Sequence, residues 1–205
     1  MVLMPNIDRD EIRKFEEQTA SWWNKKGEFK GLHDINPLRA NYIDQHSPVA
    51  GRRLVDVGCG GGILAEAMAA RGAEVTGIDM AEASLEVARL HLLESGLEVD
   101  YQLALAEPFC AEHANQFDVI TCMELLEHVP DPTAVLREAL RVLGDDGELV
   151  CTEVDNASLR FDPPQPAISE WWTRFNQLQR QHGDPYVGSR LADTASALGA
   201  TGVRV

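Results

Sequence analysis

The sequence lacks the features that mark membrane-spanning or secreted proteins. No apolar run reaches the roughly 18 residues that a transmembrane helix needs, and the N-terminus lacks the charged-then-apolar pattern of a signal peptide. The chain has only four cysteines, and these show neither a CxxC pair nor a zinc-type spacing. We therefore expect free thiols in a reducing compartment, and a cytoplasmic protein.

Positive charge is also scarce. The chain carries 18 Lys and Arg residues against 33 Asp and Glu residues, which gives a formal net charge of -15. The phosphates of a nucleic acid would be repelled by such a surface, and an anionic lipid surface would not attract it. The composition therefore predicts no nucleic-acid partner.

Two helices are predicted within the first 46 residues. Asp8 can cap a helix, with Glu11 at the spacing of a capping box. Ile12, Phe15, Thr19 and Trp22 then recur at helical intervals. A loop and a second short helix are predicted over 27–46.

Residues 53–154 alternate between strand-like and helix-like segments. The apolar run at 53–57 ends in glycines, which is typical of a buried strand. Two predicted helices stop at Gly72 and Gly96, and Asp131 caps a third that opens with a proline. This alternation implies βαβ units, so we predict an α/β fold: a Rossmann-like, doubly wound, mostly parallel sheet with helices on both faces. The predicted strands are 53–57, 73–79, 98–103, 117–122 and 147–154, and the predicted helices are 62–71, 81–95 and 132–143.

The alternation stops after residue 154. An amphipathic helix is predicted at 167–182 and another helix at 189–199, and 202–205 is predicted to begin a sixth strand. This fold normally closes with an antiparallel pair of strands. Only the first strand of that pair is recognisable here, so we expect the pair to be incomplete. A central strand is excluded just after 154 by three prolines, namely Pro163, Pro164 and Pro166.

A glycine-rich loop follows the first predicted strand. Gly58 and Gly60 begin a dinucleotide-type GxGxxG pattern, but Ile63 occupies its third glycine position. The spacing is instead D-x-G-x-G-x-G, from Asp56 to Gly62. The carboxylate of Asp56 would be poorly placed near a pyrophosphate. It suits a ligand with an amino group, such as S-adenosylmethionine: Asp56 would favour the ammonium, and Asp79, ending the second strand, would hold the ribose. The alternative is that the glycines only make a tight turn.

The motif is similar to that of class I S-adenosylmethionine-dependent methyltransferases. Over residues 11–150 the chain also resembles the ubiquinone-biosynthesis O-methyltransferases, through "FEEQTASWWNKKGEFKGLHDINPLR", "LVDVGCGGGILAEAMAARGAEVTGID", "LHLLESGLEVDY" and "FDVITCMELLEHVPDP". That family methylates catechol-type hydroxyls on polyprenylated rings. After residue 154 the sequence departs from the family and looks more like other methyltransferases.

The resemblance implies a set of cofactor-binding residues. Arg39 would pair with the methionine carboxylate, and Met123 would pack on the adenosyl group. Ala106 and Glu107, after the third strand, are placed to meet the adenine edge. The full predicted set is Arg39, Asp56, Gly58, Gly60, Asp79, Met80, Ala106, Glu107 and Met123.

The segment "MELLEHV" offers Glu124, Glu127 and His128 beside the predicted cofactor site. One helical turn would place both carboxylates on one face. Together with the imidazole they form a candidate Mg²⁺ site, as the family resemblance also implies. Alternatively, Glu127 and His128 are catalytic, with His128 as the base that takes the phenol proton. A purely structural role remains the third interpretation.

Two adjacent tryptophan pairs, at 22–23 and 171–172, have two interpretations. They could wall an apolar ring site, or they could serve the core or a subunit contact. Because neighbouring residues on a helix face different directions, one of each pair can be buried while the other is exposed.

We therefore predict one domain over 1–205: a helical cap at 1–50, a cofactor-binding core at 51–154, and an acceptor-side insertion with a truncated sheet end at 155–205. The predicted reaction is O-methyl transfer from S-adenosylmethionine to a small catechol- or quinol-type acceptor, with a polyprenylated ubiquinone precursor as the leading acceptor. A lipophilic acceptor would bring the protein to the membrane periphery, and an oligomer is compatible with the sequence. The alternatives are a different soluble acceptor, a domain that binds the cofactor without turnover, and an NAD-dependent oxidoreductase.

Overall fold

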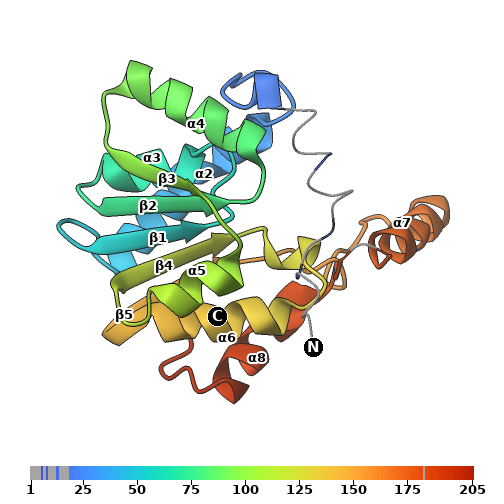
Figure 1. The fold of residues 1–205 in the computed structure, drawn as a ribbon. Coiled ribbons are helices and arrows are strands. Elements are labelled where there is room, and N and C mark those ends of the chain that lie inside the picture. Colours follow the sequence, from blue (N-terminus) through green and yellow to red (C-terminus); the bar gives the residue numbers. More distant parts are fainter. Residues whose placement is uncertain (1–5, 7, 9–12, 14–18, 182) are drawn as a thin grey trace.

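Five parallel strands form the central sheet, in the order β3-β2-β1-β4-β5 (Figure 1). The computed structural model describes residues 6, 8, 13, 19–181 and 183–205. The strand order reverses between β1 and β4, so the carboxyl ends of these two strands form the switch point where such sheets bind ligands. The predicted Rossmann-like α/β fold is confirmed. The strands are β1 (Arg53–Val57), β2 (Glu74–Asp79), β3 (Val99–Leu103), β4 (Phe117–Met123) and β5 (Leu143–Thr152).

Helices cover both faces of the sheet (Figure 1). Each face has its own apolar cluster. Side chains alternate between faces along a strand: in β1, Leu54 joins one cluster and Val55 and Val57 join the other. The first cluster packs against α2 (Lys30–His46), α3 (Ile63–Ala69) and α4 (Glu82–Ser95), and the second against α5 (Ala106–Glu112) and α6 (Pro132–Val142).

The predicted helix signals in this core are confirmed. Gly72 and Gly96, which follow α3 and α4, have φ of 90° and 67°, in the left-handed region that glycine adopts without strain. The Asp131 side chain accepts a 3.0 Å hydrogen bond from the Ala134 N–H at the start of α6.

Within residues 30–152, three elements differ from the sequence-based expectation. The second helix, α2, is longer than predicted and contains Pro37. Helix α5 was not predicted, because its seven residues include Pro108, which a helix tolerates only in its first turn. β5 begins at Leu143 rather than 147, and its register with β4 shifts between Phe117 and Val119.

The predicted sixth strand at 202–205 is wrong. Residues 200–205 form no strand and pair with none of the five strands in the described part of the chain. Among the described residues, β5 is therefore an edge strand. The predicted N-terminal helix lies largely outside the described residues, as do Glu11, Ile12 and Phe15. Of that segment the structure describes the short 3-10 helix η1 (Thr19–Ser21).

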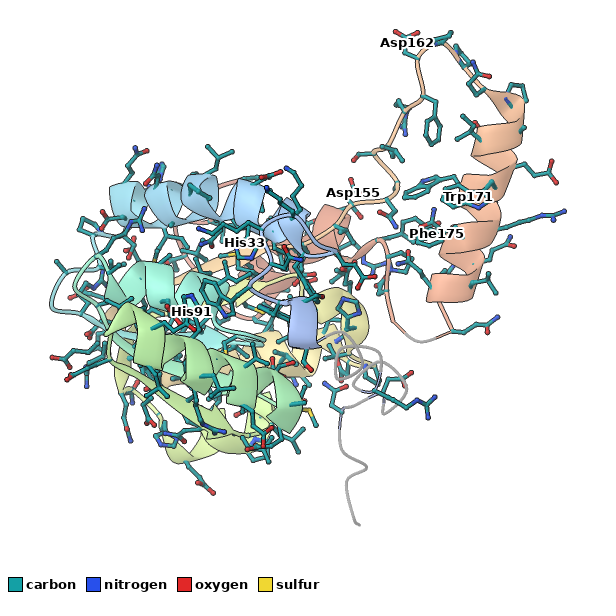
Figure 2. All side chains as sticks on the ribbon, turned by 90° about the horizontal axis from the view of Figure 1, so that it is seen from above. His33, His91, Asp155, Asp162, Trp171 and Phe175 are labelled. Atoms are coloured by element: carbon teal, nitrogen blue, oxygen red, sulfur yellow. The ribbon has the colours of Figure 1, made fainter. Side chains whose placement is uncertain are left out.

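Residues 155–181 form an arm that stands away from the sheet (Figure 2). It consists of an extended segment and α7 (Pro166–Gln179), close to the predicted helix at 167–182. The rings of Trp171 and Phe175 stack, as do those of Trp172 and Phe175. The chain returns from the arm through η3 (Val187–Arg190) to α8 (Leu191–Ala197), in place of the single helix predicted at 189–199. No helix among the described residues is long and apolar enough to cross a bilayer.

Candidate functional site

A cavity of about 230 Å³ lies at the carboxyl ends of β1, β2 and β4. This is the switch point of the sheet, where ligands bind in folds of this type. Of the predicted site residues, only Glu127 is absent from the cavity lining. The others all line it: Arg39, Asp56, Gly58, Gly60, Asp79, Met80, Ala106, Glu107, Met123, Glu124 and His128.

The glycine loop is covered by a tryptophan from the N-terminal region. A Cβ atom on Gly60 would lie 2.4 Å from the Trp22 ring, and one on Gly61 would lie 2.2 Å from it. Gly58 and Gly60 also have φ of 74° and 52°, which favours glycine. The glycines therefore do more than turn the chain: they let Trp22, which itself lines the cavity, reach the backbone.

Asp79 holds the glycine loop in place. One carboxylate oxygen accepts a 2.8 Å hydrogen bond from the Gly60 N–H, and the other accepts one of 2.8 Å from the Ala81 N–H. Burial raises the pKa of Asp79, and these N–H groups oppose that rise. Since a carboxylate oxygen can accept two hydrogen bonds, both oxygens can still receive a ligand's hydroxyls.

Asp56 lies buried beneath the cavity at the end of β1. It pairs with Thr121 across the strands, and the Thr121 hydroxyl donates a 2.7 Å hydrogen bond to its carboxylate. Burial raises the pKa of Asp56 to about 6, against the lowering effect of Thr121. At neutral pH the group is ionised, and a positively charged ligand group beside it would offset the cost of burying that charge.

Arg39 and Glu124 form an ion pair at the cavity. The Arg39 side chain is 11% exposed, and among the described residues its Nε has no hydrogen-bond partner. A buried guanidinium with an unused N–H is suited to an anionic ligand group. Glu124 has φ of 54°, which is unusual for a residue with a Cβ atom and recurs at functional sites.

The predicted grouping of Glu124 with Glu127 on one helical turn is wrong. Glu124 precedes the short helix η2 (Leu126–His128) and turns to Arg39, because its left-handed backbone breaks the helical path. Glu127 instead contacts His128, with 3.3 Å between Oε1 and Nε2, and its side chain is only 12% exposed. In the part of the chain that the structure describes, no group of three His, Cys, Asp or Glu residues is placed to hold a metal ion.

Glu153 supports the candidate site from outside the cavity lining, and the sequence reasoning missed it. Just past β5, its carboxylate accepts hydrogen bonds from the N–H groups of Leu125 and Leu126, at 3.1 and 2.8 Å, and of Glu127, at 3.3 Å. Burial raises the pKa of Glu153 to about 7. It thereby anchors the segment that carries Glu124 and His128. A polar residue at the carboxyl end of a strand beside the switch point was the available signal.

The rim of the cavity joins α5 to the N-terminal segment. The Asn6 side chain donates a 2.7 Å hydrogen bond to the Glu107 carboxylate, and both residues line the cavity. Asn6 and Asp8 were not predicted as site residues, since contacts so distant along the chain leave no local pattern. Taken together, two acidic groups, a buried guanidinium and a glycine-rich loop suit an S-adenosylmethionine-type ligand.

A family model described as a methyltransferase domain matches residues 9–205. The ubiquinone biosynthesis O-methyltransferase of Stutzerimonas stutzeri (strain A1501) is 56% identical over 152 residues, which cover 74% of this chain and 66% of that protein. The protein of that name from Saccharophagus degradans is 55% identical over 150 residues, covering 73% and 64%. The chain thus spans just under two thirds of the length of these relatives.

The crystal structure of the YcgJ protein from Bacillus subtilis is similar, with a TM-score of 0.63 and 28% identity, covering 81% of this chain and 68% of that one. The match to the family model extends over nearly the whole chain, and the strand order and the position of the cavity agree with it. The chain belongs to the family of methyltransferase domains.

Proposed function

We propose that the chain binds S-adenosylmethionine in this cavity and transfers its methyl group to a hydroxyl oxygen of a small catechol- or quinol-type acceptor. The observation that carries the proposal is the joint arrangement of Asp79, Asp56 and Arg39 around one glycine-lined cavity. The names of the relatives support the O-methyl transfer.

In this proposal each side chain of the cavity meets a different part of the cofactor. Asp79 accepts the ribose hydroxyls, Asp56 faces the ammonium, and Arg39 exchanges Glu124 for the carboxylate. Met80 and Met123 pack on the adenosyl group, and Ala106 and Glu107 meet the adenine. S-adenosylmethionine supplies an electrophilic methyl group, so the protein's remaining tasks are to align the acceptor oxygen and to remove its proton.

His128 is the group proposed to take that proton. It lines the cavity, and its Nε2 lies 3.3 Å from the Glu127 carboxylate. This is an ion-pair distance and not a hydrogen bond in the structure; if the carboxylate accepted from Nε2–H in the complex, Nδ1 would be the unprotonated nitrogen. Glu127 would thus set the tautomer, and Nδ1 would receive the proton of the acceptor hydroxyl. A Mg²⁺-assisted reaction would instead require Glu124 to leave Arg39 and Glu127 to turn from His128.

The arm is proposed to form part of the acceptor site. Its base lies on the segment that carries His128: the Asp184 N–H donates a 2.9 Å hydrogen bond to the Glu127 carbonyl, which Gly183 also contacts. The aromatic cluster of Trp171, Trp172 and Phe175 suits an apolar ring or an isoprenoid tail. The curated relatives match only 74% of the chain, and this favours a second candidate, a methyltransferase with a different small acceptor.

The test is methyl transfer from radiolabelled S-adenosylmethionine to a panel of catechols with and without short prenyl chains, each assayed with and without EDTA. We expect the double variant Glu127→Gln with His128→Gln to lose about 100-fold or more in kcat, while S-adenosylhomocysteine binds as before. The exposed Glu94→Gln is the matched control. Full activity of the double variant would contradict the base role, and loss of activity in EDTA would favour the metal-assisted reaction. Transfer to none of the catechols would contradict the acceptor class.

A further inference from the structure

Three side chains outside the cavity form a connected group behind the glycine loop. None of Glu66, His91 and Trp23 lines the cavity. Glu66 lies in α3 directly after the loop and is 4% exposed. The Nδ1 atom of His91, from α4, lies 2.8 and 2.9 Å from the two oxygens of its carboxylate. A buried carboxylate is costly without a partner, so this contact fixes the His91 ring.

Trp23 links the His91 ring to the glycine loop. The two rings are stacked, with centroids 3.4 Å apart and an angle of 2° between their planes. The Trp23 Nε1–H donates a 3.0 Å hydrogen bond to the carbonyl oxygen of Gly61. Figure 2 shows His91 on α4 and His33 on α2; the His33 ring lies 5.6 Å from that of Trp23.

The loop is therefore held from two sides. On the cavity side, Asp79 accepts from the Gly60 N–H, and Trp22 covers the glycines. On the outer side, Trp23 fixes the Gly61–Gly62 peptide group through the Gly61 carbonyl. The outer contact limits how far the Gly60–Gly61 backbone can move away from the cavity. A loop already held in its binding conformation binds more tightly, because less ordering is required on binding.

We propose that Glu66, His91 and Trp23 are positioning residues that set the cofactor affinity through the glycine loop without touching the cofactor. The inference rests on the proposed function to the extent that S-adenosylmethionine and its product are the ligands of the cavity. It differs from a purely structural role, in which the same residues would support folding and leave the affinity of the folded protein unchanged.

The test uses Trp23→Phe and His91→Phe. Trp23→Phe keeps an aromatic ring and the Glu66–His91 contact but removes the N–H that bonds Gly61. His91→Phe keeps a ring for stacking but leaves Glu66 unpaired, so Trp23→Phe is the variant expected to fold without difficulty. The matched control is His113→Phe, because His113 also stacks on an aromatic ring, that of Phe109 at 4.1 Å, away from the loop.

Each folded variant is titrated with S-adenosylhomocysteine by calorimetry and assayed for kcat and KM. We expect Trp23→Phe to raise the dissociation constant roughly 3- to 10-fold, as for the loss of one hydrogen bond. His91→Phe should raise it by a smaller factor, because His91 acts on the loop only through Trp23. The kcat at saturating cofactor should stay within about twofold, and the double variant should be no weaker than the weaker single one, since both act through Gly61.

If Trp23→Phe, His91→Phe and the control bound S-adenosylhomocysteine with equal affinity, the inference would be wrong, even if their melting temperatures fell. The proposed function would still stand. A loss of kcat with unchanged KM for the cofactor would also overturn it. If the unmodified chain did not bind S-adenosylhomocysteine, the proposed function would fail, and the inference with it.

Discussion

The walls of the cavity and the arm are held together by different kinds of interaction. Around the cavity, partly buried carboxylates accept hydrogen bonds from backbone N–H groups: Asp79 from two residues and Glu153 from three. In the arm, aromatic rings stack, and Trp171 is 57% exposed. Charge-assisted hydrogen bonds fix atoms in place, whereas stacked rings offer an apolar surface that tolerates different shapes. In the proposed function, the first suits the cofactor, and the second suits an acceptor whose shape can vary.

Asp79→Ala should give the largest change, on the cavity side. It removes the proposed ribose contacts and leaves the N–H groups of Gly60 and Ala81 unpaired. At about 1.5–3 kcal/mol for each hydrogen bond to a charged group, the affinity for S-adenosylhomocysteine should fall about 100-fold or more. Calorimetry on Asp79→Ala and on the exposed control Asp100→Ala measures it. An affinity that stays the same in both would refute the ribose assignment.

Gly60→Ala should be next in size. A Cβ atom there meets the Trp22 ring at 2.4 Å, and φ is 52°. Gly96→Ala is the matched control, since φ is 67° but no atom lies within 4 Å. We expect the control to lose about 1 kcal/mol from backbone strain alone, and Gly60→Ala to lose about 2 kcal/mol more through overpacking. Urea unfolding of both variants measures their free energies of unfolding. Equal losses of stability would mean that Trp22 does not cover the loop.

Asp56→Asn should separate stability from binding. Because burial raises the pKa of Asp56 from 3.8 to about 6, the unfolded chain ionises first, and the stability of the native protein falls as the pH rises from about 4 to about 6. The variant lacks this loss, so at pH 8 it should be up to about 3 kcal/mol more stable than the native chain. The two should melt alike near pH 4.

The same variant should bind S-adenosylhomocysteine roughly tenfold more weakly at pH 8, since one charge-assisted contact is lost. Thermal melts at both pH values, with titrations at pH 8, check the two halves of the prediction. A variant that is less stable at pH 8, or one that binds as tightly as the native chain, would contradict the assigned role of Asp56.

Trp171→Ala should give the smallest change in stability and none in cofactor binding. The side chain is 57% exposed, so its loss should cost about 1 kcal/mol or less. The affinity for S-adenosylhomocysteine should stay within about twofold, while KM for an apolar acceptor rises. Calorimetry and steady-state kinetics on this variant test how far the two regions are independent. A weaker cofactor affinity would show that the arm also shapes the cavity.

The sequence predicted those parts of the fold and site whose signals are local. Gly72, Gly96 and Asp131 mark helix ends through their own backbone or side-chain chemistry, and the D-x-G-x-G-x-G spacing located the cavity. Contacts between distant segments were beyond local patterns: Trp22 over the glycine loop, Glu153 beneath residues 125–127, and the Arg39–Glu124 ion pair. The left-handed backbone of Glu124 also overrode the helical spacing on which its predicted pairing with Glu127 depended.

The central claim is that the glycine-lined cavity binds S-adenosylmethionine rather than a dinucleotide. Calorimetric titration of the intact chain with S-adenosylhomocysteine and, separately, with NAD tests it most directly. The account predicts one binding site for S-adenosylhomocysteine and no heat of binding for NAD, because Asp56 and Ile63 disfavour a pyrophosphate. Binding of NAD, or failure to bind S-adenosylhomocysteine, would contradict it.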